Sequence, residues 1–398
     1  FYIALFIVVA TGCKQTVLNK PNVTNTTPPG VVTNPVATNL NGKASITYTL
    51  PGNSDLLYVK AVYETSPGHP QEVKASHYTN TLTVVGFGDT LAHTVKLYAV
   101  NSSEVASAPV TVTVNPLTPA ILLARRSLQV KATFGGFTLT CNNPTLENLA
   151  IIPLVDTTGN KKWVQTTGMD NIYSNSIIIK AAVRGQAAIT REYAFVVRDR
   201  WLNYSDTLFA VLTPFFEQLL PKSAWSIYAL PNDAKQASFV DATAIGIFDG
   251  NFTQPHWPNC LFTVENDPAP TTLTLNLGAA HVFSRLQINP FADLGNGNRD
   301  YYIRGSLKDF EIWGSNNPSI SGAYDASWTL LTTCHVVKPS GLPMYTETPA
   351  DQALAAAGWQ FDFPAGLGSY QYIRIRNLRN WQGSYFMSMI QFTLWGSK

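Results

Sequence analysis

The stretch IFDGNFTQPHW, residues 247–257, gathers side chains that could hold a ligand or do chemistry. Asp249, Asn251 and Thr253 offer oxygen atoms at alternate positions, and His256 and Trp257 follow them directly. Calcium prefers six to eight hard oxygen ligands, whereas a small-molecule site combines an apolar surface with a few polar groups. Three interpretations therefore compete: a catalytic loop, a calcium-holding loop and the rim of a binding site.

The rest of the sequence gives the catalytic interpretation little support. A glycosidase needs two carboxylates at a defined separation, and no pair stands out among the 25 acidic residues. The serine-hydrolase, zinc-protease, phosphate-loop and dinucleotide motifs are missing, and the six histidines show no metal-ligand spacing. We therefore predict that the protein is not an enzyme and has no catalytic residues.

The binding interpretation draws on three loops. A pyranose ring presents an apolar C–H face and a ring of hydroxyls, so a sugar site needs an aromatic platform and planar polar groups. The loop at 247–257, the Gly- and Asn-rich segment 289–309 and the last loop, RNWQGSYF, supply such residues. The predicted glycan-binding residues are His256, Trp257, Arg299, Asp300, Tyr301, Trp381 and Tyr385.

The composition limits the class of partner. The formal net charge is +2 and charged residues make up only 13% of the chain, so the basic surface that nucleic-acid binding needs is missing. Many Thr, Asn, Tyr and Trp residues instead predict a neutral polar surface. Such a surface suits uncharged partners, sugars among them.

The N-terminal residues predict export and a lipid anchor. A ten-residue apolar run, too short to span a bilayer, precedes Thr11, Gly12 and Cys13. An apolar segment ending in small residues is typical of a secretory signal peptide, although a buried strand is an alternative. Small residues before a cysteine resemble the lipobox of bacterial lipoproteins, which implies cleavage before Cys13 and acylation of its thiol. We expect a signal peptide over 1–12 and a flexible Asn-, Thr- and Pro-rich tether over 13–30.

The remaining chain has the pattern of an all-β protein. Short runs such as KASITYTL alternate β-branched and polar residues between turn signals, and the best helical candidate is the short PFFEQLLPKSAW, residues 214–225. A weak repeat relates 93–119 to 191–214, with Tyr98 and Tyr193 at equivalent positions on a strand. We expect immunoglobulin- or fibronectin-like sandwiches over 31–116 and 117–214, with both tyrosines packed inside.

The last part of the chain contains four segments in a recognisable order. They are AIGIFDGNFTQPHW, TLTLNLGAAHVFSRLQI, DFEIWGSNNP with SWTLL, and GSYQYIRIRNLRNWQGSYFMSMIQFTLWGS. In TLTLNL and YIRIRNL, period-two alternation predicts one row of side chains in a core and the other toward solvent. The order resembles that of the discoidin family, also called the coagulation factor V/VIII type C domain, which includes the family-32 carbohydrate-binding modules.

This resemblance implies a discoidin-like, galactose-binding-like jelly-roll β-sandwich over 215–398, and by loop it places the predicted residues in variable binding loops. Many relatives hold calcium with residues of the type of Asp249, Asn251 and Thr253, closed by a Glu near the C-terminus. Here Ser388, Met389 and Ile390 align instead, and a thioether is a poor calcium ligand. The sequence therefore predicts no certain cofactor, with a structural calcium at these three residues left as an alternative.

The whole chain resembles surface lipoproteins of Bacteroidetes polysaccharide-utilisation systems. This implies a protein anchored to the outer membrane by lipid only, exposed at the cell surface, which captures polysaccharide or oligosaccharide beside a transporter complex. Two alternatives stay open: an adhesion or assembly protein that binds a partner protein through the same loops, and an unrecognised glycoside hydrolase. Cys141, Cys260 and Cys334 remain after Cys13, and buried free thiols are favoured over a Cys260–Cys334 bridge.

Overall fold

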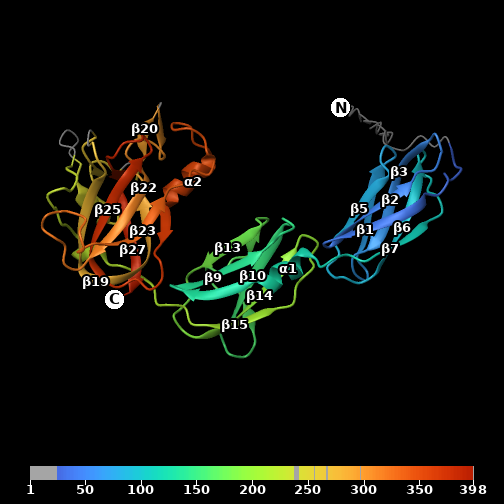
Figure 1. Cartoon of the computed structure of the whole chain (residues 1–398), viewed down its shortest axis with the longest axis horizontal. Helices are drawn as coiled ribbons and strands as arrows, with labels where there is room; N and C mark the ends of the chain where they lie inside the picture. The colour runs from blue at the N-terminus through green and yellow to red at the C-terminus, as the bar shows by residue number, and fades with distance from the viewer. Residues whose placement is uncertain (1–24, 237–241, 255, 266–267, 296, 398) are drawn as a thin grey trace, which may run out of the picture. The chain divides into compact units, whose positions relative to one another are not determined.

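The computed structural model describes residues 25–236, 242–254, 256–265, 268–295 and 297–397. The predicted signal peptide, Cys13 and residues 13–24 of the predicted tether lie outside these ranges. Over the described residues the protein is all-β and multidomain, with two smaller sandwiches and a larger C-terminal one (Figure 1). One compact unit contains the first sandwich and most of the second, and the other contains the C-terminal sandwich with 131–138 and 182–191.

The first sandwich consists of a three-stranded sheet in the order β1-β2-β5 and a four-stranded sheet in the order β4-β3-β6-β7. Alternate residues such as Ile46 on β2 and Val59 on β3 are fully buried between the sheets. The strands are β1 Thr33–Leu40, β2 Lys43–Thr49, β3 Leu56–Glu64, β4 Pro70–Ser76, β5 Thr81–Val85, β6 His93–Asn101 and β7 Val110–Val114.

Residues 25–30 differ from the expected tether because they are fastened to the first sandwich. The Asn25 side chain donates to the Asp55 carboxylate at 2.7 Å, and the Asn25 backbone N–H donates to Ser103 Oγ at 3.0 Å. The Gly30 N–H donates to Asn53 Oδ1 at 2.9 Å. Polar side chains of the sandwich thus satisfy backbone groups of this segment. The segment packs on the first sandwich although its composition is polar and rich in Pro.

The second sandwich has a sheet in the order β11-β10-β14-β15, with β12 also paired to β10, and a three-stranded sheet in the order β13-β9-β8. Tyr193 on β14 is fully buried as expected, whereas Tyr98 of the first sandwich is half-buried under the Lys60 ammonium. The elements are α1 Ala120–Ser127, β8 Gln129–Thr133, β9 Gly136–Asn142, β10 Leu149–Asp156, β11 Trp163–Val164, β12 Ile172–Ser174, β13 Ile178–Val183, β14 Arg191–Asp199 and β15 Leu208–Leu212.

The C-terminal sandwich is organised around β19, Thr271–Asn289, which pairs with β25 and β17 through its first half and with β27 and β24 through its second. The expected helix over 214–225 is wrong: β16 pairs with β27 there, and only the short η1 follows Pro221. The other elements are β16 Gln218–Leu219, η1 Lys222–Ala224, β17 Ser226–Ile227, η2 Ala244–Phe248, β18 Leu261–Phe262, β20 Asp293–Gly295, β21 Asn298–Asp300, β22 Leu307–Ser315, β23 Thr329–His335, α2 Pro349–Ala357, β24 Trp359–Asp362, β25 Tyr370–Asn380, β26 Ser388–Met389 and β27 Gln391–Ser397.

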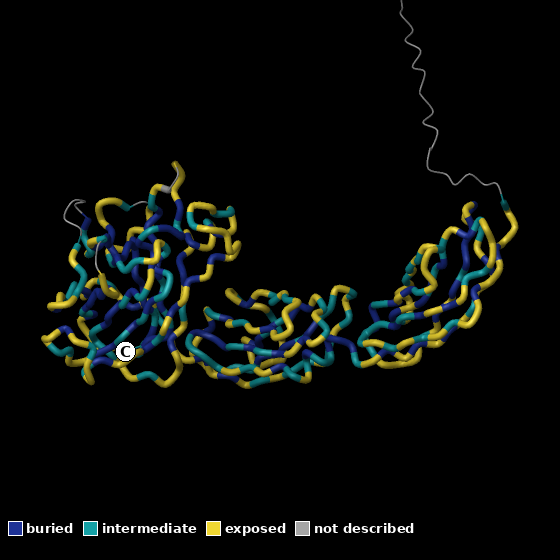
Figure 2. The backbone as a smooth tube through the Cα atoms, turned by 45° about the horizontal axis from the view of Figure 1, so that its top comes forward, coloured by how far each residue is buried: buried dark blue, intermediate teal, exposed yellow. Residues whose placement is uncertain are grey.

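The core of this sandwich is apolar on one face of β19 and β25, with Leu273, Leu275, Ile373 and Ile375 nearly or fully buried. Buried residues run through the interior of this sandwich, while exposed residues gather at its periphery (Figure 2). Among the described residues, no helix is long and apolar enough to cross a membrane.

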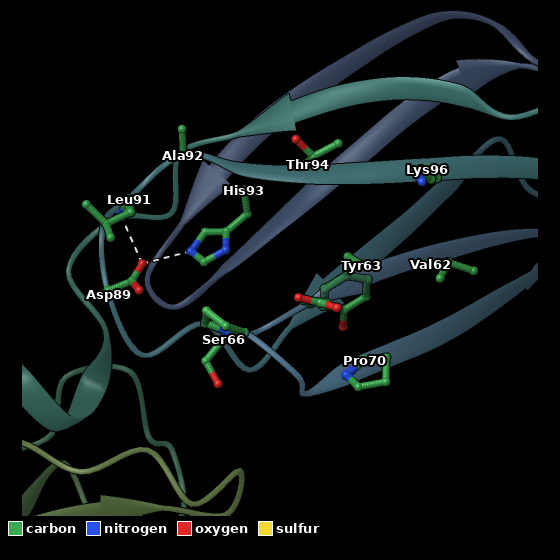
Figure 3. Close-up of a pocket in the computed structure, with 12 residues that line it drawn as sticks. Val62, Tyr63, Ser66, Pro70, Asp89, Leu91, Ala92, His93, Thr94 and Lys96 are labelled. Carbon is green, nitrogen blue, oxygen red and sulfur yellow. Dashed lines mark hydrogen bonds and ion pairs between the residues drawn. The ribbon is translucent and has the colours of Figure 1, made fainter.

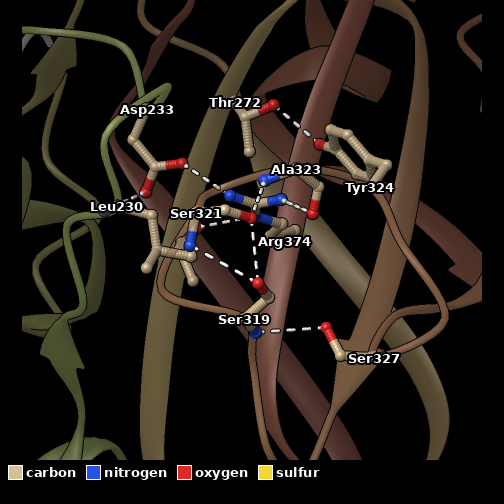
Figure 4. Close-up of polar contacts among 10 residues, drawn as sticks. Leu230, Asp233, Thr272, Ser319, Ser321, Ala323, Tyr324, Ser327 and Arg374 are labelled. Atoms are coloured by element: carbon tan, nitrogen blue, oxygen red, sulfur yellow. Dashed lines mark hydrogen bonds and ion pairs between the residues drawn. The ribbon is translucent and has the colours of Figure 1, made fainter.

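The other row of β19 and β25 does not face solvent as expected. Thr272, Thr274 and Arg374 are buried. The Arg374 guanidinium pairs with the Asp233 carboxylate at 3.3 Å, beside the Tyr324 ring (Figure 4). It also donates to Thr274 Oγ1 at 3.0 Å, and the Tyr324 and Trp328 rings lie within 5 Å of it. The loop between β22 and β23 covers this face with Tyr324 and Trp328, and the segment that carries Asp233 covers it through the buried ion pair with Arg374.

Candidate functional site

The loop at 249–257 is shaped by its own polar side chains. The Asn251 N–H donates to Asp249 Oδ1 at 2.8 Å, and the Thr253 N–H donates to Asn251 Oδ1 at 3.0 Å. Gly250 has φ +82°, a conformation that glycine adopts without strain. Consecutive side-chain-to-backbone turns of this kind fix the loop without regular secondary structure.

His256 is turned inward rather than toward a ligand. Its Nε2 lies 2.7 Å from Asp249 Oδ2, and its side chain is only 6% exposed. Burial alone would raise the pKa of Asp249, but hydrogen bonds from the Asn251 N–H and His256 hold it below its usual value. His256 therefore positions the loop, and the structure does not present it as a surface contact.

The loop carries two exposed aromatic residues, Phe252 and Trp257. Trp257 is 43% exposed, and its indole packs against the rings of Phe291 and Phe262, with centroids 5.9 and 6.3 Å away. The Gln254 side chain clamps the loop to the neighbouring segment, donating to the Pro290 carbonyl at 2.7 Å and accepting from the Ala292 N–H at 2.9 Å. The indole is thus held on an aromatic base while part of its surface stays open.

Charged side chains surround this aromatic base. Arg299 is exposed and donates to the Ala292 carbonyl at 2.9 Å. The Arg304 guanidinium stands 5.6 Å from the Phe262 ring centroid, pairs with Asp293 at 3.0 Å and also pairs with Glu265. We call Trp257, Arg299, Arg304, Asp293 and Glu265 the Trp257 rim.

Three residues of this rim were missed by sequence reasoning. Arg304 and Asp293 lie in the Gly- and Asn-rich loop that was singled out, but nothing in the loop distinguished them from their neighbours. Glu265 lies outside all three predicted loops. Only the fold brings Glu265 and Asp293 to one guanidinium.

Asp300 and Tyr301 face the interior. Asp300 is 4% exposed, and burial raises the pKa of its carboxyl although Lys338 acts in the opposite direction. The N–H groups of Tyr301 and Tyr302 both donate to Glu347 Oε1, at 2.8 and 2.7 Å. An external ligand cannot reach the Asp300 side chain, so its placement as a glycan contact is corrected, and Tyr301 is half-buried beside it.

Trp381 packs against residues outside the Trp257 rim, and Tyr385 is tied to the sheet through its backbone carbonyl. The Trp381 ring meets Tyr302 edge to face at 5.2 Å, and the Lys308 ammonium stands 4.4 Å above it. The Tyr385 carbonyl accepts from Asn377 Nδ2 at 2.7 Å and from the Thr271 hydroxyl, and the side chain is half-buried. Trp381 therefore packs as part of the core edge, and of the seven predicted residues Trp257 and Arg299 belong to the rim.

Two of the three residues expected as calcium ligands, Asp249 and Asn251, direct oxygens at an amide nitrogen instead. Gln391 Nε2 donates to Asp249 Oδ1 at 2.6 Å, to the Gly246 carbonyl at 2.7 Å and to the Asn251 carbonyl at 3.1 Å. Lys222 Nζ donates to Gln391 Oε1 at 2.8 Å. A cation at the centre of these oxygens would displace the Gln391 amide, so the arrangement does not fit calcium. Within the described ranges no group of three or more His, Cys, Asp or Glu residues could hold a metal.

The first sandwich contains a cavity of about 520 Å³ between the outer face of β3 and β6 and the adjoining loops (Figure 3). His93 Nε2 lies 2.8 Å from the Asp89 carboxylate at its edge, and Tyr63 and Lys96 also line it.

The predicted free thiols are confirmed: Cys141, Cys260 and Cys334 are unpaired and buried. Neither the cavity of the first sandwich nor these thiols belong to the Trp257 rim.

Comparison with known proteins gives three family matches along the chain. Residues 29–116 match DUF4959, residues 117–223 match DUF5126 and residues 248–396 match DUF5000, each a domain of unknown function. A search of curated protein sequences finds no match.

Among solved structures, a SusE-like protein is 26% identical, covering 70% of this chain and 99% of its own, with a TM-score of 0.45. The chain is similar to a SusE-like protein. The family 32 carbohydrate-binding module of C. perfringens NanJ, in complex with galactose, is 19% identical over 45% of this chain and 98% of its own, with a TM-score of 0.30. The C-terminal domain of a Bacteroides fragilis chitobiase is 12% identical over 45% and 98%, with a TM-score of 0.32.

Proposed function

We propose that this protein binds glycans without catalysing their conversion, and that the Trp257 rim contacts the sugar. The observation that carries the proposal is the 43% exposed Trp257 indole, held on Phe262 and Phe291 beside guanidinium and carboxylate groups. An indole face packs against the C–H face of a pyranose, and planar charged groups hydrogen-bond to its hydroxyls.

The charge balance of the rim favours an uncharged sugar. The rim contains two arginines, Arg299 and Arg304, and two carboxylates, Asp293 and Glu265, so its formal charges cancel. Arg304 is engaged by both carboxylates, which leaves little net attraction for an anion. Hydroxyl groups, which both donate and accept, suit such a mixed set.

The cellular role in this proposal is capture. Acylation at Cys13 would hold the protein at the outer membrane through lipid alone, and the rim would retain polysaccharide or oligosaccharide near the enzymes and the transporter complex that use it. The N-terminal sequence pattern supports this placement. Protease treatment of intact cells tests it, since protection of the protein would contradict surface exposure.

In this proposal, the loop that presents Trp257 is held in place without calcium. The Gln391 amide donates to the oxygens of Gly246, Asp249 and Asn251, and Lys222 Nζ in turn donates to Gln391 Oε1. Hydrogen bonds from the chain itself would then fix the 249–257 loop. Binding should accordingly survive a chelator.

A binding screen tests the function. The full chain is passed over immobilised plant, host and microbial polysaccharides with and without EDTA, together with Trp257→Ala and, as a matched control, Tyr78→Ala, which removes an 89% exposed aromatic ring from the first sandwich. We expect retention by a neutral polysaccharide that Trp257→Ala weakens at least tenfold and Tyr78→Ala leaves unchanged. Equal retention by wild type and Trp257→Ala would remove the rim from the proposal.

The two alternatives have their own outcomes in the same experiment. Release of reducing sugar that Glu265→Gln or Asp293→Asn abolishes would establish a hydrolase. Capture of a transporter complex by a protein that retains no saccharide would favour an assembly role.

A further inference from the structure

The outer face of the second sandwich carries four side chains in one row across neighbouring strands. Ala150 of β10 pairs with Tyr173 of β12 on one side and with Arg198 of β14 on the other. Arg198 in turn forms a bridge with Tyr204. Residues paired directly across antiparallel strands point to the same face. The row therefore sets a guanidinium between two tyrosines, with only the small Ala150 separating it from Tyr173.

A cavity of about 490 Å³ opens at this row. Tyr173 and Arg198 line it together with Asn148, Asn175 and Arg200 from the adjoining turns. Tyr173 is 67% exposed, and Asn148, Asn175 and Arg200 are exposed as well. The volume lies in the range of small-ligand sites, and the lining combines an aromatic ring with amide and guanidinium groups.

The cavity has an excess of positive charge. Asp199 is the one carboxylate among its lining residues, and its own turn occupies it: it accepts from the Trp201 N–H at 2.8 Å, the Asn203 N–H at 3.0 Å and Asn203 Nδ2 at 2.8 Å. Within the described part of the chain, no carboxylate forms an ion pair with Arg198 or Arg200.

Arg198 is also incompletely satisfied. Its Nε is buried and has no hydrogen-bond partner among the described residues. Hydrogen bonding from Asn171 and the positive charge of Arg198 lower the pKa of the Tyr173 hydroxyl, which reflects how close the guanidinium lies to that ring. Because Nε is buried, a ligand would meet Arg198 at its terminal nitrogens, where the side chain also hydrogen-bonds to the Tyr204 and Tyr173 hydroxyls.

We propose that this cavity is a second glycan-binding site, and that it takes a sugar residue bearing a carboxylate, such as a uronic acid. The planar guanidinium fork of Arg198 or Arg200 matches a carboxylate with two parallel hydrogen bonds, and the Tyr173 ring packs against the sugar's C–H face. The site differs from the Trp257 rim, where two carboxylates already engage Arg304. It rests on its own residues and stands whether or not the rim binds sugar.

Calorimetric titration of the full chain tests this site. The probes are oligogalacturonate, oligoguluronate, hyaluronan oligomers and sialyllactose, each paired with its carboxyl-reduced derivative, and a sulfated neutral oligosaccharide. The variants are Arg198→Gln and Tyr173→Ala. Arg126→Gln is the matched control, because it removes one exposed positive charge from helix α1 of the same sandwich. Trp257→Ala reports on the other site.

We expect at least one carboxylated probe to bind at least tenfold more tightly than its reduced form. Arg198→Gln and Tyr173→Ala should each lose about tenfold in affinity at unchanged melting temperature, while Arg126→Gln and Trp257→Ala keep wild-type affinity. Binding of no carboxylated probe, equal binding of the reduced forms, or tighter binding of the sulfated probe would overturn the proposal. Loss of acidic-sugar binding in Trp257→Ala, with Arg198→Gln unaffected, would assign the acidic sugar to the rim instead.

Discussion

Gln391 Nε2 lies 2.6 Å from Asp249 Oδ1 and so joins the start of β27 to a loop 142 residues earlier in the chain. The same nitrogen also donates to the carbonyl of Gly246 in η2 and to the carbonyl of Asn251 in the loop. A neutral amide has two N–H groups, and here both are directed into a cluster of oxygens. The loop that presents Trp257 is therefore tied to the sheet through one side chain.

The first prediction concerns this tie and calcium. The melting temperature of the wild-type protein should not change with EDTA or with millimolar calcium. Gln391→Glu should lower the free energy of unfolding by about 2 kcal/mol, because three acceptors lose their donor and a second carboxylate meets Asp249. Added calcium should recover part of this loss, since the variant offers two carboxylates and two carbonyls to one ion.

Gln391→Ala is the control for this experiment. It removes the same donor without adding a carboxylate, so its loss of stability should not respond to calcium. A wild-type melting temperature that rises with calcium and falls with EDTA would show that a metal does bind at the loop.

The second prediction concerns Gln254 as a positioning residue. Gln254→Ala removes both hydrogen bonds that clamp the 249–257 loop to the segment at 290–292. We expect glycan affinity at the Trp257 rim to fall about tenfold while the protein stays folded, because the indole is no longer held in one place. Gln360→Ala is the control, since Gln360 is exposed and bonds to Gln287 and Arg285 elsewhere. Unchanged affinity in Gln254→Ala, measured by calorimetry, would contradict the clamp.

The third prediction concerns the buried pair of Asp233 and Arg374. Asp233→Asn keeps the shape of the side chain but leaves the Arg374 guanidinium buried without a counter-charge. Urea unfolding should show a loss of about 3 kcal/mol. Asp362→Asn provides the same substitution in an exposed pair with Arg184 and should cost less than about 1 kcal/mol. Equal losses in the two variants would show that burial does not determine how much an ion pair contributes to the free energy of unfolding.

The fourth prediction concerns pH. Burial raises the pKa of Cys141 to about 11 and of Cys260 and Cys334 to about 12, from an ordinary 9.0. Between pH 9 and these values the unfolded chain has lost thiol protons that the folded chain retains. Each thiol therefore lowers the free energy of unfolding by up to about 1.4 kcal/mol per pH unit in that window.

Lys222 acts in the opposite sense, because burial lowers its pKa to about 8 and its contribution to stability rises between pH 8 and its ordinary 10.5. Three thiols against one lysine should make stability decline above pH 9. Urea titrations under reducing conditions at pH 8.5, 9.5 and 10 measure this, and Cys260→Ala should show a shallower decline. The same decline in Cys260→Ala would remove that thiol from the explanation.

The sequence predicted the all-β class and the C-terminal sandwich from period-two alternation, because strands with one buried face leave that signal. It missed the burial of Thr272, Thr274 and Arg374, because a covering loop from elsewhere in the chain is invisible to a strand's own pattern. A buried arginine also looks the same in a sequence as an exposed one. The alternation correctly placed Ile373 and Ile375 in the core.

Prediction of the site was less complete for a related reason. Loop composition pointed to Trp257 and Arg299, which are accessible, but also to Asp300 and His256, whose side chains the structure turns inward. Which loop residue faces solvent depends on hydrogen bonds to distant segments. Glu347 holds the backbone beside Asp300, and neither spacing nor residue type indicates that contact.

The long strand β19 has a mechanical consequence for the C-terminal sandwich. Residues 271–276 pair with β25 and residues 282–289 pair with β27, so one continuous strand belongs to both pairings. Separating β25 or β27 from β19 must break the hydrogen bonds along one half of β19 and strain the other half. A captured polymer that pulls on the rim would therefore apply force to both pairings at once. The domain should then unfold in one cooperative step rather than strand by strand.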